Sequence, residues 1–312
     1  AGGITLDGNI TTTDAQTYNS AVTLNSNTGS VALTGNGVRF VDTVDNSPSA
    51  STAQTLSVNQ GSGQARFEDE VGGIHGALGA LTVNGTGQVQ FYDSVQAASL
   101  ATLSSTLLYG NVTTQGAQAY GGVLYLATPV TLTSNGGDVT IDGAVENFVP
   151  GTSEALTIST GAGDLSFGDV VGGAAGALGA LALDGSGATT FADTVQAASL
   201  VTGTGPVELG GSVTTTGAQT YNGTVTLNVP GDATLTGTTV TLNGVTGNGN
   251  NLTVAGNAAL NGTLAGVNDL AVTGATMFGT ANVATSGAQT YSGAVTLAGD
   301  TTLDTTTGNG AV

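Results

Sequence analysis

The chain of 312 residues contains no cysteine, no lysine and no tryptophan, and Arg39 and Arg66 are its only permanently cationic side chains. Without cysteine it can form no disulfide, zinc–thiolate or iron–sulfur site. Without lysine it can form no side-chain isopeptide bond, so any assembly is predicted to be non-covalent. The net charge of −19 is the opposite of the basic footprint that nucleic-acid binding needs, and an anionic membrane surface would repel it.

Long apolar runs are missing as well. The longest apolar-looking run, Val171–Leu183, contains several glycines and falls well short of the length of about 20 apolar residues that a membrane-spanning helix needs. Glycine alone occurs 52 times, and the abundant Thr, Asn and Val are weak helix formers. We therefore expect no membrane insertion and an all-β fold.

The chain instead repeats itself. Residues 71–102 return as residues 171–202, with 20 of 32 positions identical. Such repetition is typical of a solenoid, in which each unit stacks on its neighbour. A catalytic site is normally a singular place, so the repetition also argues against an enzyme. We predict a single solenoid whose super-repeats are approximately residues 1–103, 104–203 and 204–312.

A second repeated motif, Ala-Gln-Thr-Tyr or a near copy, ends at Tyr18, Tyr120, Tyr221 and Tyr291. The first two intervals between these tyrosines are nearly equal, the third is shorter, and all of them are long. The four tyrosines should therefore lie several coils apart and should not stack on one another. We expect them to mark one wall of each super-repeat.

Short stretches of alternating apolar and polar residues run through the whole chain, for example Ile4–Leu6, Val22–Leu24 and Val225–Leu227. Alternation with period 2 is typical of strands, and the Asn-Gly, Asp-Gly and Gly-Ser pairs between them supply turns. These strands are shorter than the length of about five or six residues that sandwiches use. The pattern predicts a right-handed parallel β-helix, whose coils hydrogen-bond to the coils above and below at about 4.8 Å spacing.

A finer period sets the expected length of a coil. The interval from Phe67 to Phe91 is the same as the interval from Phe167 to Phe191. One coil is therefore predicted to have roughly 18–27 residues, which gives roughly 12–16 coils. Each phenylalanine pair is a candidate core stack, and such pairs contribute about 0.5–1.5 kcal/mol beyond the burial of their area.

Two further contacts follow from the same stacking. Asn59 and Asn84 fall at equivalent positions, and we expect an amide ladder between them at an inner bend. Val71–Leu81 and its twin Val171–Leu181 place apolar residues between glycines. They are the first candidates for a protrusion or a lateral contact, although the same residues would equally suit a core.

Residues 217–227 (GAQTYNGTVTL) and 287–297 (GAQTYSGAVTL) resemble the repeats of very large bacterial surface proteins. These are the filamentous-haemagglutinin-like and autotransporter-like adhesins, whose shafts are right-handed parallel β-helices. The similarity covers most of the chain at the level of its repeats and indicates architecture more than activity. The resemblance implies export, an extracellular or bacterial cell-surface location, and a structural or adhesive role.

Candidates for catalysis are weak. His75 is the only histidine, and Ala175 replaces it in the second copy, so a loop residue is expected. Residues 68–70 (Glu-Asp-Glu) and the pair Asp164 and Asp169 have the chemistry that glycoside hydrolysis uses. A charge run is, however, typical of a solvated face. Polysaccharide lyases that resemble β-helices rely on Arg or Lys with calcium, which two arginines support poorly. We predict no enzyme and no catalytic residue.

Two other motifs have residues suited to ligand sites. Residues 135–138 (Asn-Gly-Gly-Asp) are similar to part of a calcium-binding nonapeptide repeat, but they occur once. We therefore expect a turn there and no cofactor, leaving diffuse binding of Ca²⁺ to the acidic surface as the remaining option. The threonine runs 11–13 and 214–216 recur with the super-repeat rather than once per coil, so no continuous ice-binding array is expected.

The two ends of the chain look like ordinary repeat sequence rather than caps. The open end of a β-helix exposes unpaired backbone groups that template further pairing. Either the chain is an excerpt of a longer one, or copies join head to tail in a contact that does not close and so builds a filament. We favour the filament, and the candidate junction residues are Ile4, Leu6, Ile10, Leu303 and Val312.

The sequence therefore predicts a non-enzymatic extracellular structural protein that is a subunit of a head-to-tail β-helical filament or surface fibre, with itself as its main partner. The alternative is an adhesin shaft that binds cell-surface or matrix glycans or neighbouring cells. Extended loops and exposed aromatic residues on one face would favour the alternative. Uniform short turns would favour the scaffold.

Overall fold

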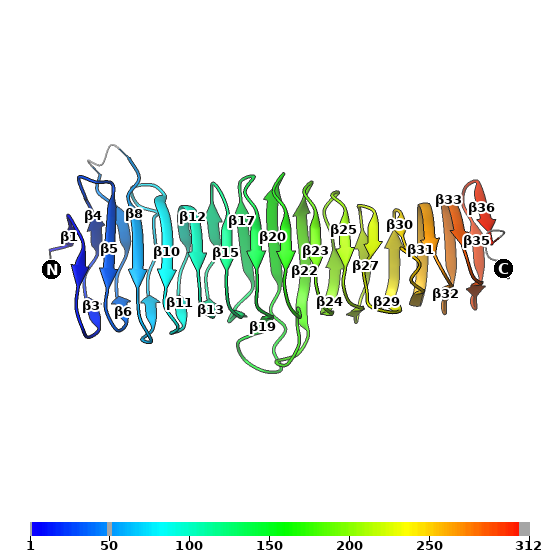
Figure 1. Cartoon of the computed structure of the whole chain (residues 1–312), viewed down its shortest axis with the longest axis horizontal. Coiled ribbons are helices and arrows are strands. Elements are labelled where there is room, and N and C mark those ends of the chain that lie inside the picture. Colours follow the sequence, from blue (N-terminus) through cyan, green and yellow to red (C-terminus); the bar gives the residue numbers. More distant parts are fainter. Residues whose placement is uncertain (1, 49–51, 306–312) are drawn as a thin grey trace.

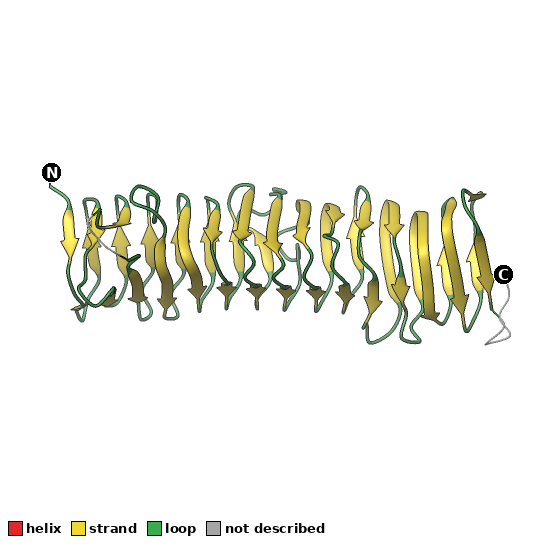
Figure 2. Ribbon diagram, turned by 90° about the horizontal axis from the view of Figure 1, so that it is seen from above, coloured by secondary structure: helices red, strands yellow, loops and turns green. Residues whose placement is uncertain are grey.

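The computed structural model describes residues 2–48 and 52–305, and these form one elongated rod of short stacked strands (Figure 1). The strands pair in parallel through about 16 turns, and none of the described residues lies in a helix. Seen from above, the strands cross the rod one after another and the loops line its edges (Figure 2). The predicted all-β parallel solenoid is confirmed, at the upper end of the expected range of coils.

Each coil contributes to three parallel sheets that run along the rod. The first sheet contains β1 (Ile4–Leu6), β4 (Val22–Leu24), β7 (Val44–Asn46), β14 (Val112–Thr114), β17 (Val130–Ser134), β20 (Leu156–Gly161), β22 (Leu178–Gly185), β27 (Gln219–Tyr221) and β35 (Val295–Leu297). The second contains β2 (Ile10–Thr11), β5 (Ser30–Thr34), β8 (Thr55–Asn59), β10 (Leu78–Asn84), β15 (Gln118–Tyr120), β18 (Val139–Ile141), β21 (Leu165–Phe167), β23 (Thr189–Phe191), β25 (Val207–Leu209), β28 (Val225–Leu227), β30 (Val245–Thr246) and β36 (Thr301–Asp304).

The third sheet contains β3 (Gln16–Tyr18), β6 (Val38–Phe40), β9 (Ala65–Phe67), β11 (Val89–Phe91), β13 (Thr106–Leu108), β16 (Leu124–Leu126), β19 (Val145–Asn147), β26 (Val213–Thr215), β32 (Leu270–Val272) and β34 (Gln289–Tyr291). Seven longer strands turn a corner without a break, so each belongs to more than one sheet. They are β10, β22, β12 (Val95–Thr102), β24 (Val195–Val201), β29 (Ala233–Leu242), β31 (Leu252–Val267) and β33 (Thr276–Thr285).

The length of a coil varies although the register within each sheet is regular. The coil that begins at Val95 is short, because Val95 already pairs with Val112. The coil that begins at Val44 is considerably longer, because Val44 pairs with Val71. The strands keep the stacking positions, so loops at the corners take up the difference.

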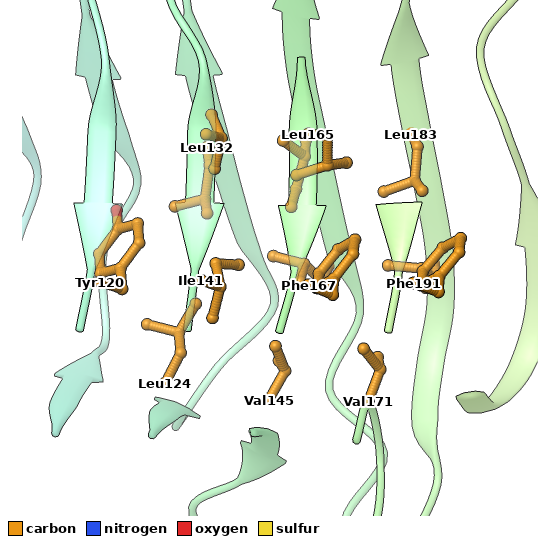
Figure 3. Packing of buried hydrophobic residues seen from close by; sticks show 14 of the residues in the cluster. Tyr120, Leu124, Leu132, Ile141, Val145, Leu165, Phe167, Val171, Leu183 and Phe191 are labelled. Atoms are coloured by element: carbon orange, nitrogen blue, oxygen red, sulfur yellow. The ribbon is translucent and has the colours of Figure 1, made fainter. Parts of the chain in front are cut away.

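Strand alternation fills the interior with apolar side chains. In β4, Val22 and Leu24 are 1% and 0% exposed, while Thr23 between them lies on the outer side. Equivalent positions then stack: Tyr120 pairs with Ile141, which pairs with Phe167, and their side chains lie next to one another along the axis (Figure 3). A continuous apolar core therefore runs through the rod.

The candidate core stacks of phenylalanine lie in this interior. The rings of Phe67 and Phe91 are stacked with centroids 4.9 Å apart in the third sheet. The rings of Phe167 and Phe191 are stacked at 5.0 Å in the second sheet. The interval between the two members of each pair is thus one coil in both cases.

The column in the third sheet is longer than the phenylalanine spacing indicated. The ring of Tyr18 stacks on that of Phe40 at 5.1 Å, and Phe40 stacks on Phe67 at 4.9 Å. Each stacked pair contributes about 0.5–1.5 kcal/mol beyond burial. The aromatic rings therefore bind the first four coils of this column to one another.

The Asn59 and Asn84 amides do form a ladder, but not at an inner bend. Asn84 Nδ2 donates to Asn59 Oδ1 at 3.1 Å, and Asn59 Nδ2 donates to Thr34 Oγ1 at 3.2 Å. In β8 the inward positions belong to Leu56 and Val58, so Asn59 points outward and is half-buried. Strand alternation places this ladder on the outer side of the second sheet.

The tyrosine motif forms a buried chain of hydrogen bonds at a corner. In its second copy the Tyr120 hydroxyl donates to Gln118 Oε1 at 2.9 Å, and Gln118 Nε2 donates to Thr114 Oγ1 at 3.2 Å. Gln118 Nε2 also donates to the carbonyl of Thr133 in the next coil at 2.9 Å. The same side-chain contacts recur in Thr12–Gln16–Tyr18, Thr215–Gln219–Tyr221 and Thr285–Gln289–Tyr291. We call each of these a corner clamp, because it joins two coils while pairing buried polar groups.

The corner clamps also reveal how the super-repeat winds. Tyr18, Tyr120 and Tyr221 lie in the third, second and first sheet, and Tyr291 lies in the third again. Four complete coils lead from Tyr18 to Leu108 in the same column, and β14 and β15 add two more sides to reach Tyr120. Each copy is therefore turned by one side of the rod relative to the copy before it, and the tyrosines do not share one wall.

Candidate functional site

The aspartates considered for hydrolysis stabilise turns. Asp169 Oδ1 accepts a hydrogen bond from the N–H of Val170 at 2.8 Å, and Asp164 Oδ1 accepts one from the N–H of Ala188 at 2.8 Å. Asp169 belongs to a Phe-x-Asp-x-Val motif in which the aspartate accepts from the next N–H at 2.6–2.8 Å. The motif occurs five times, with Asp42, Asp69, Asp93, Asp169 and Asp193. A device repeated at five turns is structural.

The charge run at residues 68–70 does not converge on one point either. Glu68 accepts two hydrogen bonds of 2.8 Å from Arg39 and lies 3.1 Å from Arg66 Nη2. The hydrogen bond from Arg39, together with the charges of both arginines, lowers the pKa of Glu68 below its usual value. Glu70 accepts from the Ser94 hydroxyl at 3.2 Å. The acids therefore serve separate structural contacts.

His75 lies in the loop formed by residues 72–77, which is anchored on β7. Asp45 Oδ2 accepts hydrogen bonds from the N–H groups of Ile74 and His75 at 2.7 and 2.8 Å. His75 Nδ1 is 3.7 Å from the same oxygen, which is too long for a hydrogen bond. Asn46 Nδ2 donates to two further carbonyls of the loop at 2.9 Å each. The His75 side chain is therefore a loop residue beside an anchoring carboxylate.

The second copy builds the same anchor with different residues. Both oxygens of Glu146 accept hydrogen bonds of 2.9 Å from the N–H groups of Ala174 and Ala175. Asn147 Nδ2 donates to two carbonyls of this loop, residues 172–177, at 3.0 and 3.1 Å. An acid followed by Asn at the end of a strand thus holds the glycine-rich loop in both copies.

Val71–Leu81, which the sequence predicts to be either a protrusion or a core segment, is partly each. Val71, Leu78 and Leu81 are fully buried in the interior, whereas Ile74 is 60% exposed. Only the centre of Val71–Leu81 therefore leaves the core, and its flanks are part of it.

A cavity lies beside each anchored loop. The first has a volume of about 250 Å³ and is lined by Ser47 and His75 among others. The second has a volume of about 330 Å³ and is lined by Tyr125, Phe148 and Pro150 among others. Phe148 and Pro150 belong to the long excursion between β19 and β20, which is the large loop below β19 in Figure 1. The two copies therefore share an anchor but present cavities of different chemistry.

The second cavity opens onto a group of aromatic side chains on the outside of the rod. Tyr92 and Tyr109 are stacked with centroids 4.8 Å apart, and Phe148 meets Tyr109 and Tyr125 edge-on at 6.4 and 6.3 Å. We call these four residues the aromatic strip. The other tyrosines and phenylalanines of the chain pack in or against the interior. The outward-facing aromatic residues are thus gathered in one place.

The third sheet positions the strip. Tyr125 is the central, outward residue of β16, and Tyr109 and Phe148 directly follow β13 and β19. The N–H of Tyr109 donates to the carbonyl of Phe91, and the N–H of Ala127 donates to that of Leu108. Successive coils therefore place Tyr109 directly above Tyr92, and Ala127 directly above Tyr109, in one outer column. Ala127 occupies the equivalent position in the coil between those of Tyr109 and Phe148, and its small side chain leaves space for the two rings to meet.

Arg66 borders the strip, and Arg39 is joined to it through Glu68. Arg66 Nη2 donates to the Tyr92 hydroxyl at 3.0 Å, and its guanidinium carbon lies 5.3 Å from the centre of that ring, a cation–π contact. Arg39 and Arg66 share Glu68. The two arginines of this acidic chain thus share one carboxylate, and Arg66 also packs against the aromatic strip.

The remaining candidate motifs serve turns and corners. Residues 135–138 form a turn with Gly136 at φ 95°, and Asp138 Oδ1 accepts from the N–H of Asp164 at 2.9 Å. The middle residue of each threonine run, Thr12 or Thr215, belongs to a corner clamp. Within residues 2–48 and 52–305, no three His, Cys, Asp or Glu side chains gather in a way that could hold a metal ion.

The candidate junction residues lie at the ends of the described rod. Leu6 is buried at 5% exposure, and Ile4, Ile10 and Leu303 are partly buried and packed against the core. Val312 lies outside the described residues. These side chains belong to the apolar column of the end coils.

Sequence reasoning missed the aromatic strip because its members are irregularly spaced. The sequence does carry a signal for one pair of the strip. Tyr92 and Tyr109 are separated by the same number of residues as Val95 and Val112, which pair in adjacent coils. The pairing of β19 with β16, which places Phe148 beside the strip, has no such signal.

Comparison with protein families, with curated proteins and with solved structures finds no match to this chain. In the part of the chain that the structure describes, there is no helix long and apolar enough to cross a membrane. Functional inference therefore depends on the geometry of the rod and of its outer surface.

Proposed function

We propose that this chain is a non-enzymatic structural protein of the bacterial cell surface or extracellular matrix, serving as a shaft or fibre subunit. The observation that carries the proposal is the continuous stacking of parallel strands over an unbroken apolar core. Backbone ladders of this kind resist bending and local unfolding, because each strand is paired on both sides. The resemblance of the repeats to bacterial surface shafts supports the location.

Head-to-tail association of copies is part of the same proposal. In the last described coil Val295 and Leu297 are 48% and 63% exposed. They pair with Thr276 and Phe278, which are buried in the coil below. A following coil would bury both residues, and in the filament a second copy supplies it.

Electron microscopy of the purified protein tests the proposal. We expect rods that lengthen with protein concentration, and Leu297→Asp should shorten them by placing a charge in the junction. Met277→Asp is the matched control, because Met277 is also exposed at 45% but points outward between two inward residues. Round particles would overturn the shaft, and rods of one constant length at all concentrations would overturn the filament.

Glycan binding is the second candidate function. The observations that favour it are the extended excursion between β19 and β20 and the gathering of outward aromatic rings on one side. Aromatic faces that are rimmed by polar groups are suited to sugar rings, which present C–H groups on one face and hydroxyls at their edge. A shaft with such a strip would adhere along its side.

A further inference from the structure

The second cavity and the aromatic strip together have the features of a sugar site. Tyr125 and Phe148 supply ring surfaces, and Pro150 closes the apolar wall. Glu146, which is 8% exposed, lies in the same lining and uses its carboxylate for two backbone N–H groups. An ionised carboxylate has about four acceptor positions, so Glu146 retains capacity for a ligand hydroxyl.

The hydroxyl groups of the strip add donors at its edge. Tyr92 donates to Gln90 at 3.0 Å. Among the described residues, by contrast, no group hydrogen-bonds to the hydroxyls of Tyr109 and Tyr125. A buried tyrosine in this chain always has its glutamine, as in the corner clamps. Tyr125 lines the cavity, and the ring of Tyr109 contacts Phe148, which lines it too, so both unpartnered hydroxyls are available to a ligand at this part of the strip.

Charge selects the class of ligand. The chain carries a net charge of −19, so an anionic polysaccharide would be repelled, and Glu68 already pairs with both arginines. The four residues of the strip come from four successive coils, and coils stack at about 4.8 Å, which is close to the length of one pyranose unit in an extended polysaccharide. A neutral chain of sugars therefore matches both the charge and the repeat.

We propose that the aromatic strip binds a neutral polysaccharide along the rod, with one pyranose ring held in the second cavity against Tyr125 and Phe148. Glu146 accepts a hydroxyl of that ring, and the hydroxyls of Tyr109 and Tyr125 bond to its edge. The first cavity lacks aromatic walls and does not take part. This proposal rests on the second function proposed above.

Affinity electrophoresis through gels that contain a β-glucan, a mannan or a galactan tests the proposal, with alginate as the anionic comparison. We expect the protein to be retarded by at least one neutral polysaccharide and not by alginate. Tyr125→Ala should weaken binding by more than about tenfold, the factor expected from losing one ring contact and one hydrogen bond together. Tyr125→Phe keeps the ring and should weaken binding by about fivefold or less, the factor expected from losing one hydrogen bond.

His75→Ala is the matched control, because it truncates a ring in the equivalent first cavity. It should leave the retardation unchanged. No retardation by any neutral polysaccharide, equal retardation of native protein and Tyr125→Ala, or retardation by alginate would each overturn the proposal. Lateral pairing of copies that Tyr125→Ala abolishes would also overturn it, in favour of a self-association surface.

The same samples are imaged, so that the two proposals fail separately. Intact rods that bind no neutral glycan count against the sugar site alone. Round particles count against the shaft, whatever their retardation.

Discussion

The hydroxyl of Tyr120 donates a hydrogen bond of 2.9 Å to the side-chain oxygen of Gln118, two positions earlier in the same strand and inside the core. The amide group of Gln118 then reaches the next coil. Four such corner clamps keep buried glutamine and tyrosine groups paired inside the solenoid. The corner clamps fix the register of the strands, because a strand shifted by one residue would leave all of these groups unpaired.

The first prediction concerns this clamp. Gln118→Leu should destabilise the protein by about 1–3 kcal/mol, because it leaves the buried Tyr120 hydroxyl without its acceptor. Tyr120→Phe should cost about 1 kcal/mol, the net value of one hydrogen bond. Urea unfolding followed by circular dichroism measures both, with the exposed Ala119→Ser as control. A Gln118→Leu protein as stable as the native one would refute the structural role of the clamp.

The second prediction is a loss of stability in alkali. Burial raises the pKa of all four clamp tyrosines, that of Tyr291 to about 12, whereas an unfolded tyrosine ionises at about 10. The folded state therefore holds protons that the unfolded state releases. Stability should be complete below about pH 10 and should fall as the pH rises from there, for Tyr291 through about 12.

Unfolding in urea at a series of alkaline pH values, with phenolate absorbance recorded in parallel, tests this sign. Tyr291→Phe should flatten the decline between about pH 10 and 12. A stability that rises over the same range would contradict the assigned burial.

The third prediction separates the interior rings from the aromatic strip. Phe191→Ala should cost about 3–5 kcal/mol, because it opens a cavity in a packed column. Phe148→Ala removes a ring that is 42% exposed and should cost less than about 1 kcal/mol. Thermal unfolding midpoints compare the two, and equal losses would mean that Phe148 is part of the core.

The fourth prediction concerns the glycine that begins the second anchored loop. Gly172 has φ 71°, and a Cβ there would collide with the carbonyl of Gln196 in the next coil. Gly172→Ala should therefore lower stability by about 2–3 kcal/mol, the sum of backbone strain and this clash. Gly176→Ala is the control, since Gly176 has φ 109° but open space around it, and should cost about 1–2 kcal/mol. Thermal unfolding that ranks Gly176→Ala as the more damaging change would refute this account of the loop.

The sequence carried enough information for the architecture but not for the outer surface. Alternation in Val22–Leu24 and the recurring interval between Phe67 and Phe91 are local signals, and stacking of coils follows from them directly. The sheet to which a residue belongs depends on the summed lengths of all preceding coils. Because these lengths differ widely from coil to coil, the side of the rod that carries Tyr120 could not be counted from the sequence.

The aromatic strip shows the same limit. Tyr125 and Phe148 meet because β19 pairs with β16 in the third sheet and Phe148 directly follows β19 on the outer side. The anchors were equally hidden, since Asp45 and Glu146 differ in length and reach their loops in the next coil. Contacts between a loop and a neighbouring coil are set by tertiary packing, which the local pattern does not encode.

The super-repeat does not contain a whole number of coils, so its two copies are oriented differently on the rod. Val71 stacks in the first sheet, whereas its twin Val171 stacks in the third. Successive copies of the super-repeat therefore face different sides of the rod, and a molecule bound alongside one copy does not contact the same face of the other. The two anchored loops therefore have different neighbours: the cavity beside the first is lined by His75, and the cavity beside the second by Tyr125 and Phe148.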